Sequence, residues 1–462
     1  MISFLKNIYG TIKSKELPAP APAITHHFLI ILAIYFLLQD LLANNFMNNA
    51  FLFNFIKYID EIIPIFIFLL LVLTRLSHGR SLTRHPIDIP LLLFLAVSVL
   101  SSLAANVPYF IILPQFILYI KAFLLFFLFF NLPLSPWIFR QYVQVFFVTG
   151  MIFLFFGGID LLIPAQFRNI IGNTAYIDYR NGIPSVQSFF THPGVFGWFM
   201  SFLALYAFAF SVFFRKKRFF IFGLLFFLGC FFAMRARSIF GIFISLLFGL
   251  FFVPKKMRKK IILFLIPLAI IGFILIGGSL TELLQSKYDV YIAFENPMEV
   301  ARNVLYFKCV DVAADHFPLG AGMGRYGSWL SLQYYSPIYY KYGLSNVWGI
   351  SKSSPNFITD TFWPMIIGES GFIGFALYIL IFILFLSVLA KRIKTTNSTL
   401  LKAFQVGTFM ILIEGLIESI GSPIFSSPPG AFFILGAVGI ASRTHPEFER
   451  IENSLNIMLA DE

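Results

Sequence analysis

Charged residues and cysteines are both scarce in this chain. Only 12% of its 462 residues are charged, about half the share found in soluble globular domains, whereas 58% are hydrophobic and the mean hydropathy is +0.83. This composition excludes an ordinary soluble domain and indicates a polytopic membrane protein. Cys230 and Cys309 are the two cysteines, too few for a disulfide framework, and we expect both to be buried free thiols.

Several motifs that would indicate other classes of protein are also missing. The first 27 residues have no cleavable signal pattern, because no apolar core follows their basic residues. There is no Walker-type phosphate loop, and the glycines of GAGMGRYG follow no predicted strand, so neither ATP nor a dinucleotide is expected. The segments predicted to face outward contain no Asp-x-Asp pair. We therefore expect neither a cofactor nor a metal ion.

Apolar runs recur along the whole chain. A helix that crosses the hydrocarbon core of a bilayer needs about 20 apolar residues. About twelve stretches approach this length, and the sequence therefore predicts an all-α membrane domain of about twelve transmembrane helices. They are centred approximately on residues 28–44, 61–76, 88–105, 109–131, 142–163, 193–214, 219–234, 238–253, 261–279, 364–390, 399–420 and 424–442.

The net charge of +12 does not indicate a nucleic-acid partner. Most Lys and Arg residues form short clusters between apolar runs, such as RKKR at 215–218 and KKMRKK at 255–260. Such clusters mark the cytoplasmic side of a membrane protein. They alternate along the chain, so both termini are predicted to be cytoplasmic, and the long segment 280–361 is predicted to be periplasmic.

These patterns predict five regions. They are a cytoplasmic N-terminal segment (1–27), transmembrane helices one to nine (28–279), a periplasmic loop with amphipathic helices (280–361), transmembrane helices ten to twelve (362–442) and a cytoplasmic tail (443–462).

Arg235 and Arg237 break the charge rule, because they join two apolar runs on the predicted outer side. An Arg at mid-membrane costs about 2.5–3.5 kcal/mol even on lenient insertion scales, and less towards the interface. Both side chains can reach lipid headgroups or a loop carboxylate. The helix that starts near Ser238 also presents its N-terminus here, so two guanidinium groups beside it suit a phosphate ligand.

Other outward-facing residues are weaker candidates. His192 precedes Pro193 at a predicted helix start, where a His is either a cap or a hydrogen-bonding group for a substrate. In the long loop, a helix predicted from 297 to about 315 carries Arg302, and a glycine-rich turn carries Arg325. Tyr334 and Tyr335 belong to a Tyr- and Trp-rich segment that fits either an interfacial aromatic belt or sugar stacking.

Four carboxylates complete the set of candidates. Asp360 lies at the outer mouth of the tenth predicted span, and Glu369 lies about two turns further in. An acid beside outward arginines can act as a general base. Glu414 and Glu418 lie one turn apart within a predicted span, which makes them candidates for function or for pairing.

Three of these segments, in this order, resemble the bacterial O-antigen ligase/polymerase family, the Wzy-like membrane glycosyltransferases. The segments are FFTHPGVFGWF, then RARSIFGIF, then ARNVLYFKCVDVAADHFPLGAGMGRYG leading to DTFWPMIIGESGFIG. The resemblance covers roughly residues 180–390. It implies a GT-C-like fold in the bacterial inner membrane and an inverting, metal-independent enzyme that acts at the periplasmic face on undecaprenyl-diphosphate-linked glycans.

The resemblance also suggests roles for individual residues. Arg235 or Arg237, together with Arg302, match arginines attributed to diphosphate binding, and Asp360 is the expected base. Ligases of the family have a His at the position of Asp360, so the resemblance favours a polymerase that builds O-antigen, capsule or exopolysaccharide. His192, Arg325, Glu369, Tyr334 and Tyr335 are expected to contact substrate.

Two alternatives remain open. One is a ligase of the same family, which transfers the glycan to the lipid A-core of lipopolysaccharide or to protein. The other is a polysaccharide or lipid transporter, for which Glu414 and Glu418 are the relevant signal. The expected partners are the lipid bilayer and undecaprenyl-diphosphate-linked glycans, and a chain-length regulator is compatible with the polymerase.

Overall fold

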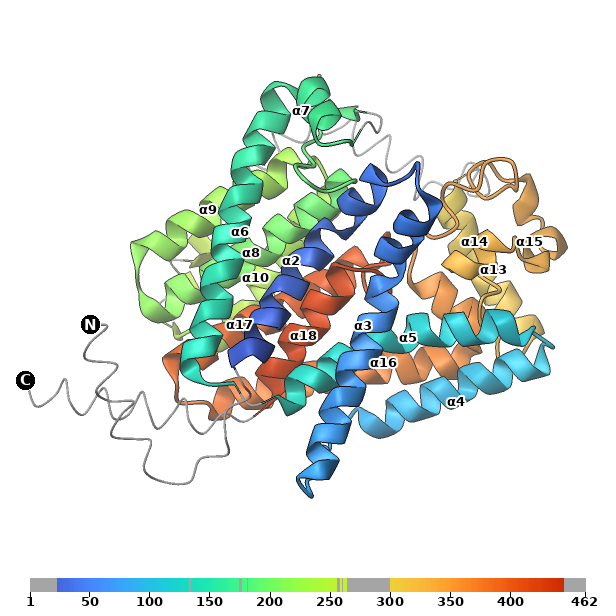
Figure 1. Cartoon of the computed structure of the whole chain (residues 1–462), viewed down its shortest axis with the longest axis horizontal. Helices are drawn as coiled ribbons and strands as arrows, with labels where there is room; N and C mark the ends of the chain where they lie inside the picture. The colour runs from blue at the N-terminus through green and yellow to red at the C-terminus, as the bar shows by residue number, and fades with distance from the viewer. Residues whose placement is uncertain are drawn as a thin grey trace, which may run out of the picture.

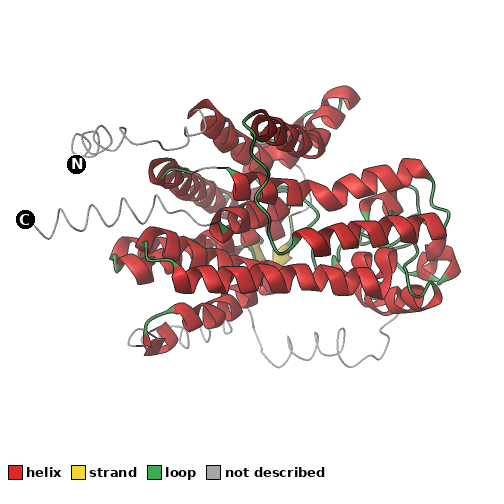
Figure 2. Cartoon of the chain, turned by 90° about the horizontal axis from the view of Figure 1, so that it is seen from below, coloured by secondary structure: helices red, strands yellow, loops and turns green. Residues whose placement is uncertain are grey.

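The computed structural model describes residues 23–132, 134–173, 177–180, 182–255, 258–259, 261–263 and 300–443. In this part of the chain the regular structure is helical, apart from one antiparallel strand pair, β1 (Tyr179–Arg180) and β2 (Ile183–Pro184). Figure 2 shows that pair in yellow among the red helices. The predicted all-α class is therefore confirmed for the described residues.

The helices coincide with the predicted apolar stretches (Figure 1). The exception is the stretch 261–279, which lies almost wholly outside the described residues. The matching helices are α2 (Ala23–Asn45), α3 (Ala50–Ser77), α4 (Asp88–Ala104), α5 (Tyr109–Asn131), α6 (Pro136–Leu162), α8 (Pro193–Phe214), α9 (Lys217–Phe232), α10 (Ala236–Gly249), α16 (Trp363–Thr395), α17 (Thr399–Glu418) and α18 (Gly430–Ser442).

Among the described residues, 6 helices are long and apolar enough to cross a membrane, namely α2, α5, α6, α8, α16 and α17. The chain is therefore a multi-pass membrane protein by helix length and hydropathy. α4, α18 and α10 with its extension η1 (Leu250–Phe252) are apolar but shorter. α3 is long but carries Lys57, Asp60 and Glu61. The total of twelve spans stays a prediction.

The start of the last predicted stretch was placed too early. The sequence predicts a span from 424, whereas α18 begins at Gly430. Pro428 and Pro429 explain the difference, because neither has a backbone N–H and each disfavours a helical residue before it. A turn therefore separates α17 from α18.

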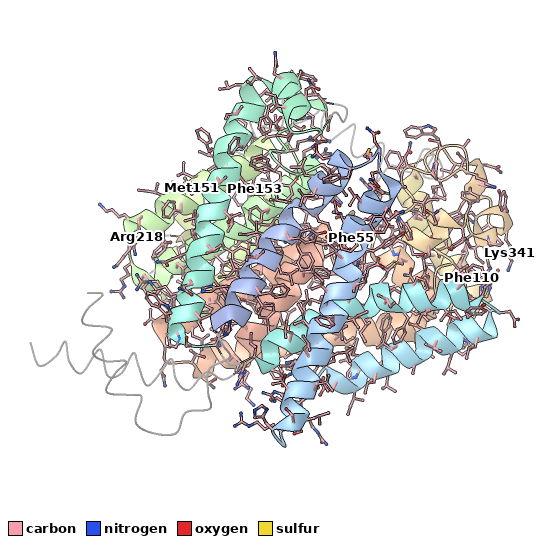
Figure 3. All side chains as sticks on the ribbon, viewed as in Figure 1. Phe55, Phe110, Met151, Phe153, Arg218 and Lys341 are labelled. Atoms are coloured by element: carbon pink, nitrogen blue, oxygen red, sulfur yellow. The ribbon has the colours of Figure 1, made fainter. Side chains whose placement is uncertain are left out.

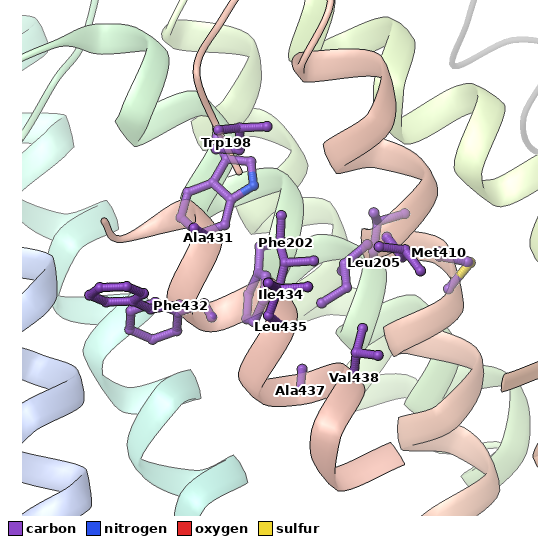
Figure 4. Packing of buried hydrophobic residues seen from close by; sticks show 14 of the residues in the cluster. Trp198, Phe202, Leu205, Met410, Ala431, Phe432, Ile434, Leu435, Ala437 and Val438 are labelled. Carbon is purple, nitrogen blue, oxygen red and sulfur yellow. The ribbon is translucent and has the colours of Figure 1, made fainter. Parts of the chain in front are cut away.

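The centre of the bundle is formed by α8, which is buried along most of its length and packs against α9 and α17. Figure 4 shows side chains of α8, α17 and α18 meeting there. Trp198 and Phe202 of α8 both lie beside Phe433 of α18, with ring centroids 6.4 and 6.1 Å apart. Gly439 brings α18 against the backbone of Phe126 in α5. Close contact through small residues is how helices associate in a bilayer, where water does not drive them together.

A buried ion pair joins α3 to α5. Lys121 Nζ lies 2.5 Å from Asp60 Oδ2, and both side chains are buried. Gln39 of α2 donates to Asp60 Oδ1 at 2.9 Å, so three helices share one carboxylate. A charge inside a membrane helix is tolerated when it is paired in this way. Helix packing therefore explains why Lys121 occurs within the apolar stretch 109–131.

The described part of the long loop forms a cap on one end of the bundle (Figure 1). It contains α13 (Ala301–Asp315), α14 (Trp329–Gln333), α15 (Pro337–Lys341) and η3 (Leu344–Asn346). The helix predicted from 297 to about 315 is α13, although residues 297–299 and the loop before them lie outside the described residues. α13 packs against α16.

The cap and the basic cluster at 215–218 lie at opposite ends of the molecule. Figure 3 labels Lys341, in α15 of the cap, at one edge and Arg218, in the basic cluster, at the other. The sides of the membrane assigned to these two segments stay a prediction.

Candidate functional site

The α9–α10 turn places Arg235 and Arg237 at one end of the bundle. Arg235 is the N-cap residue of α10, and Met234 before it has a φ of 54°, in the left-handed region. For a residue with a side chain, that conformation costs roughly 1–2 kcal/mol. Such strain commonly occurs at functional sites. It turns the chain sharply enough for two helices to meet with no polar loop between them.

A short hairpin contributes two charges that the sequence did not single out. Arg180 Nη1 donates to the Met234 carbonyl at 2.8 Å, and Asp178 Oδ2 accepts from Arg235 Nη2 at 3.1 Å. Arg180 Nε also lies 3.2 Å from Asp178 Oδ2. The Asn-Gly dipeptide at 181–182 is the usual signal for such a hairpin and could have indicated that residues 178–180 fold back onto a neighbouring element.

A buried ion pair holds the segment that carries the hairpin in place. Arg168 of α7 (Pro164–Ile170) donates to Asp160 at 2.8 Å, and the two side chains are 2% and 0% exposed. The same carboxylate accepts from the backbone N–H groups of Gln187 and Ser188. Arg168 also donates to the Ser185 carbonyl. These contacts give Arg168 a structural role.

Arg302 and Asp360 meet across the cap. Arg302 Nη2 lies 2.6 Å from Asp360 Oδ2, and the side chains are 34% and 30% exposed. The helix that carries Arg302 is fixed by Tyr306, which donates to the Ile420 carbonyl at 2.7 Å in the turn after α17. Trp363, at the start of α16, donates to Ser419 in the same region. Asp360 is therefore held beside a basic group at the mouth of the bundle.

Arg237 points towards the end of α17. Its Nε lies 3.9 Å from Glu418 Oε2, and its guanidinium group occupies the space next to Gly421 where a Cβ would otherwise lie. Glu418 also accepts from Ser238, and Glu414 one turn deeper accepts from Ser201 at 2.7 Å. The two carboxylates thus form a buried polar layer directly below the arginines.

His192 caps α8 and faces the same charges. Its Nδ1 accepts from the Gly194 N–H at 3.0 Å, which leaves the other ring nitrogen to carry the proton of the neutral form. The pKa of His192 is lowered to about 4, first because surrounding protein reduces its hydration and then because Arg235 and Arg237 repel a positive charge there. Both roles predicted for this residue, cap and hydrogen-bond donor, are compatible with its geometry.

The arginines act on one another as a group. The pKa of Arg235 is lowered to about 10, mainly by burial and then by Arg180, with smaller contributions from Arg237 and Arg302, while Asp178 opposes the shift. The guanidinium group of Arg235 is therefore still charged at neutral pH. We call Arg180, Arg235, Arg237 and Arg302 the arginine cluster.

Some donors of this cluster lack acceptors. Among the described residues, the Nε atoms of Arg235 and Arg302 are buried without a hydrogen-bond partner. A buried donor without an acceptor costs about 1–3 kcal/mol or more when it is charged. A ligand with several negative oxygen atoms would remove that cost, so the arrangement is suited to a phosphate or a diphosphate.

Glu369 lies away from solvent, beneath the glycine-rich turn. It is 0% exposed, accepts from Tyr119 at 2.6 Å and accepts from the Tyr326 N–H at 3.2 Å. Gly371 interrupts α16 with a φ of 67°, and next to it the backbone of Gly322 donates to the Glu369 carbonyl at 3.0 Å. The contacts of Glu369 thus attach the turn to α16.

Arg325 and the two tyrosines belong to the cap itself. Arg325 is half-buried, and this burial lowers its pKa. Tyr334 is 52% exposed and packs on Phe110 at the start of α5. Tyr335 is buried and donates to the Ile350 carbonyl at 3.0 Å. The structure therefore separates this aromatic pair, and Tyr334 is the one that offers an open ring.

The described residues contain no group of three His, Cys, Asp or Glu side chains that could hold a metal ion. An apolar pocket of about 120 Å³ lies between α2, α6 and α18, and its lining contains none of the arginine cluster. The candidate site therefore consists of an open group of arginines with adjacent carboxylates.

No protein-family model matches the chain, and no curated protein matches it significantly.

Proposed function

We propose that this protein is a membrane glycosyltransferase that polymerises undecaprenyl-diphosphate-linked oligosaccharides into a surface polysaccharide at the periplasmic face. The main support is the arginine cluster, because three separate segments contribute its four guanidinium groups and two of these have buried N–H donors without acceptors among the described residues. A diphosphate diester carries the negative oxygen atoms that such donors need.

The charge balance of the site favours an anionic ligand. Arg237 and Arg302 each pair with one carboxylate, whereas Arg180 and Arg235 share the single carboxylate of Asp178. When a glycosyl–diphosphate bond breaks, negative charge develops on the leaving phosphate oxygen. Guanidinium groups that are already in place stabilise this charge without reorganising, which is the largest contribution in many enzymes.

Asp360 has the geometry of a base for the acceptor sugar. An ionised carboxylate has about four acceptor positions, so Asp360 can hold Arg302 and accept a sugar hydroxyl at the same time. The hydroxyl oxygen attacks the anomeric carbon and its proton passes to Asp360. The bond from the anomeric carbon to the diphosphate breaks, and undecaprenyl diphosphate leaves with the electron pair.

Binding of undecaprenyl diphosphate to the purified full chain tests the diphosphate part of this proposal without knowledge of the sugars. Arg235→Gln and Arg302→Gln should each weaken binding about 10–100-fold, because each removes a charge-assisted contact. Lys308→Gln is the matched control, because Lys308 lies on the same helix as Arg302 but pairs with Asp311. Equal affinities in all four proteins would refute the proposal.

Chain elongation in cells tests the role of Asp360. Asp360→Asn should keep the binding of undecaprenyl diphosphate and lose elongation by about 10²-fold or more, as expected when a general base is removed. Transfer to a second lipid-linked repeat unit, compared with transfer to lipid A-core, separates a polymerase from a ligase. Elongation at the wild-type rate in Asp360→Asn would exclude the proposed base.

A further inference from the structure

A second basic region borders an open cleft of about 540 Å³ between the end of α10 and the start of α17. Three cationic side chains line it, Lys255, Arg258 and Lys402, and none of the described residues that line it is acidic. The positive-inside rule assigns these segments to the cytoplasmic side, whereas the arginine cluster lies on the predicted outer side. The cleft is therefore a separate feature from the candidate active site.

Two of the cations are held in place at the rim. Arg258 Nε donates to the Val253 carbonyl at 2.9 Å and Nη2 donates to the Phe251 carbonyl at 3.1 Å. Lys402 Nζ donates to the Thr396 carbonyl at 3.4 Å. A guanidinium group has five N–H donors and an ammonium group has three, so both retain donors for a ligand. Fixing the side chains beforehand reduces the entropy that a ligand must overcome.

Apolar side chains also line the cleft. Phe251 is 70% exposed, and Phe252 packs edge-on against Phe409 of α17 with ring centroids 4.9 Å apart. Asn397 and Thr399 add polar groups near the start of α17. The lining thus combines phenyl rings that suit hydrocarbon with cations that suit a hydrated anion, as expected where a helix bundle meets the headgroups of a bilayer.

We propose that this cleft binds a phosphate group at the cytoplasmic surface of the membrane. A phosphate carries one or two negative charges and oxygen acceptors for the three cations. Two sources share this chemistry, namely the headgroup of an anionic phospholipid, whose chains would lie along the phenyl rings, and a soluble phosphate. Basic clusters beside membrane helices bind anionic headgroups by the same electrostatics.

The test uses the purified full chain in micelles of a zwitterionic detergent. Phosphatidylglycerol, phosphatidylcholine and inorganic phosphate at constant ionic strength are titrated separately, and the rise in Tm gives an apparent affinity for each. The cleft variant is Lys255→Gln/Lys402→Gln. The control variant, Lys216→Gln/Lys217→Gln, removes the same charge from exposed residues at the start of α9 that do not line the cleft.

If the cleft binds phosphate, phosphatidylglycerol or inorganic phosphate should stabilise the wild type and the control variant equally. The same ligand should bind the cleft variant about tenfold more weakly. Stabilisation by phosphatidylglycerol alone identifies a lipid headgroup, and stabilisation by inorganic phosphate identifies a soluble ligand. Arg258→Lys is a second variant for the case in which the double variant does not fold. It keeps the positive charge but loses the paired N–H donors of the guanidinium group, so it should weaken binding less than the double variant does. Equal affinities for cleft and control variants, or equal stabilisation by phosphatidylcholine, would overturn the proposal.

Discussion

Two Arg–Asp pairs of nearly equal length lie in very different surroundings. Arg168 and Asp160 are 2.8 Å apart and almost completely buried, whereas Arg302 and Asp360 are 2.6 Å apart and about one third exposed. The buried carboxylate also accepts two backbone N–H groups. Among the described residues, Arg168 Nη1 and Arg302 Nε are both buried without an acceptor, so solvent exposure is what distinguishes the two pairs. The first pair is closed to solvent, whereas the second is accessible to a ligand.

The difference teaches that distance alone does not separate a structural ion pair from a functional one. In a buried pair, loss of one partner leaves a charge that water cannot reach, so the effect appears in folding stability. In a partly exposed pair, water replaces the lost partner, so stability changes little and any large effect appears in binding or catalysis. Three predictions use this distinction.

The largest effect on stability is expected for Arg168→Ala. It leaves the Asp160 carboxylate buried without its cation, which should lower the free energy of unfolding by about 3–5 kcal/mol. Denaturant unfolding of the purified chain in micelles measures this loss. Arg180→Ala is the control, because Arg180 pairs with Asp178 in an exposed position and should cost less than about 1 kcal/mol. Similar losses of unfolding free energy in both variants would contradict the distinction between buried and exposed ion pairs.

An intermediate effect, on function alone, is expected for Gly421→Ala. The added Cβ would overlap the guanidinium group of Arg237, which must move away from Glu418. Binding of undecaprenyl diphosphate should weaken several-fold, whereas stability should change by no more than about 0.5 kcal/mol because the end of a flexible side chain can shift. Gly158→Ala, where the Cβ would enter open space, is the control. Unaltered binding in Gly421→Ala would place Arg237 outside the ligand site.

The smallest effect is expected for His192, through pH. Its folded pKa of about 4 is below the ordinary value of 6.5, so the unfolded chain takes up a proton first as the pH falls. The folded state therefore loses stability from about pH 6.5 down to about pH 4. In His192→Asn, which retains a capping acceptor but does not titrate, Tm should depend less on pH in this window. Identical profiles of Tm against pH for the two proteins would contradict the lowered pKa of His192.

Much of the fold could be predicted from hydropathy. The ranges 109–131 and 193–214 coincide with α5 and α8, because a run of about 20 apolar residues forms a helix in a bilayer almost regardless of its neighbours. The start of α18 could not be predicted as well, since apolar composition continues through the prolines that delay it. The kink at Gly371 was also not predicted, because it depends on contact with the distant Gly320.

The candidate site was predicted only in part. Arg235 and Arg237 stand out in the sequence because they break the charge pattern of the other loops. Asp178 and Arg180 do not stand out, since isolated loop charges are common and their contacts with the α9–α10 turn come from folding. For the same reason the sequence did not show that Glu369 binds Tyr119 and the glycine-rich turn.

The amino-acid sequence by itself determined that this is a helical, multi-pass membrane protein, because hydropathy is a local sum over neighbouring residues and acts on each helix separately. Only the tertiary structure decided which ion pairs are closed to solvent and which are accessible to a ligand. That outcome depends on the distances between side chains far apart in the chain, such as Arg302 and Asp360, and on how fully each is removed from solvent.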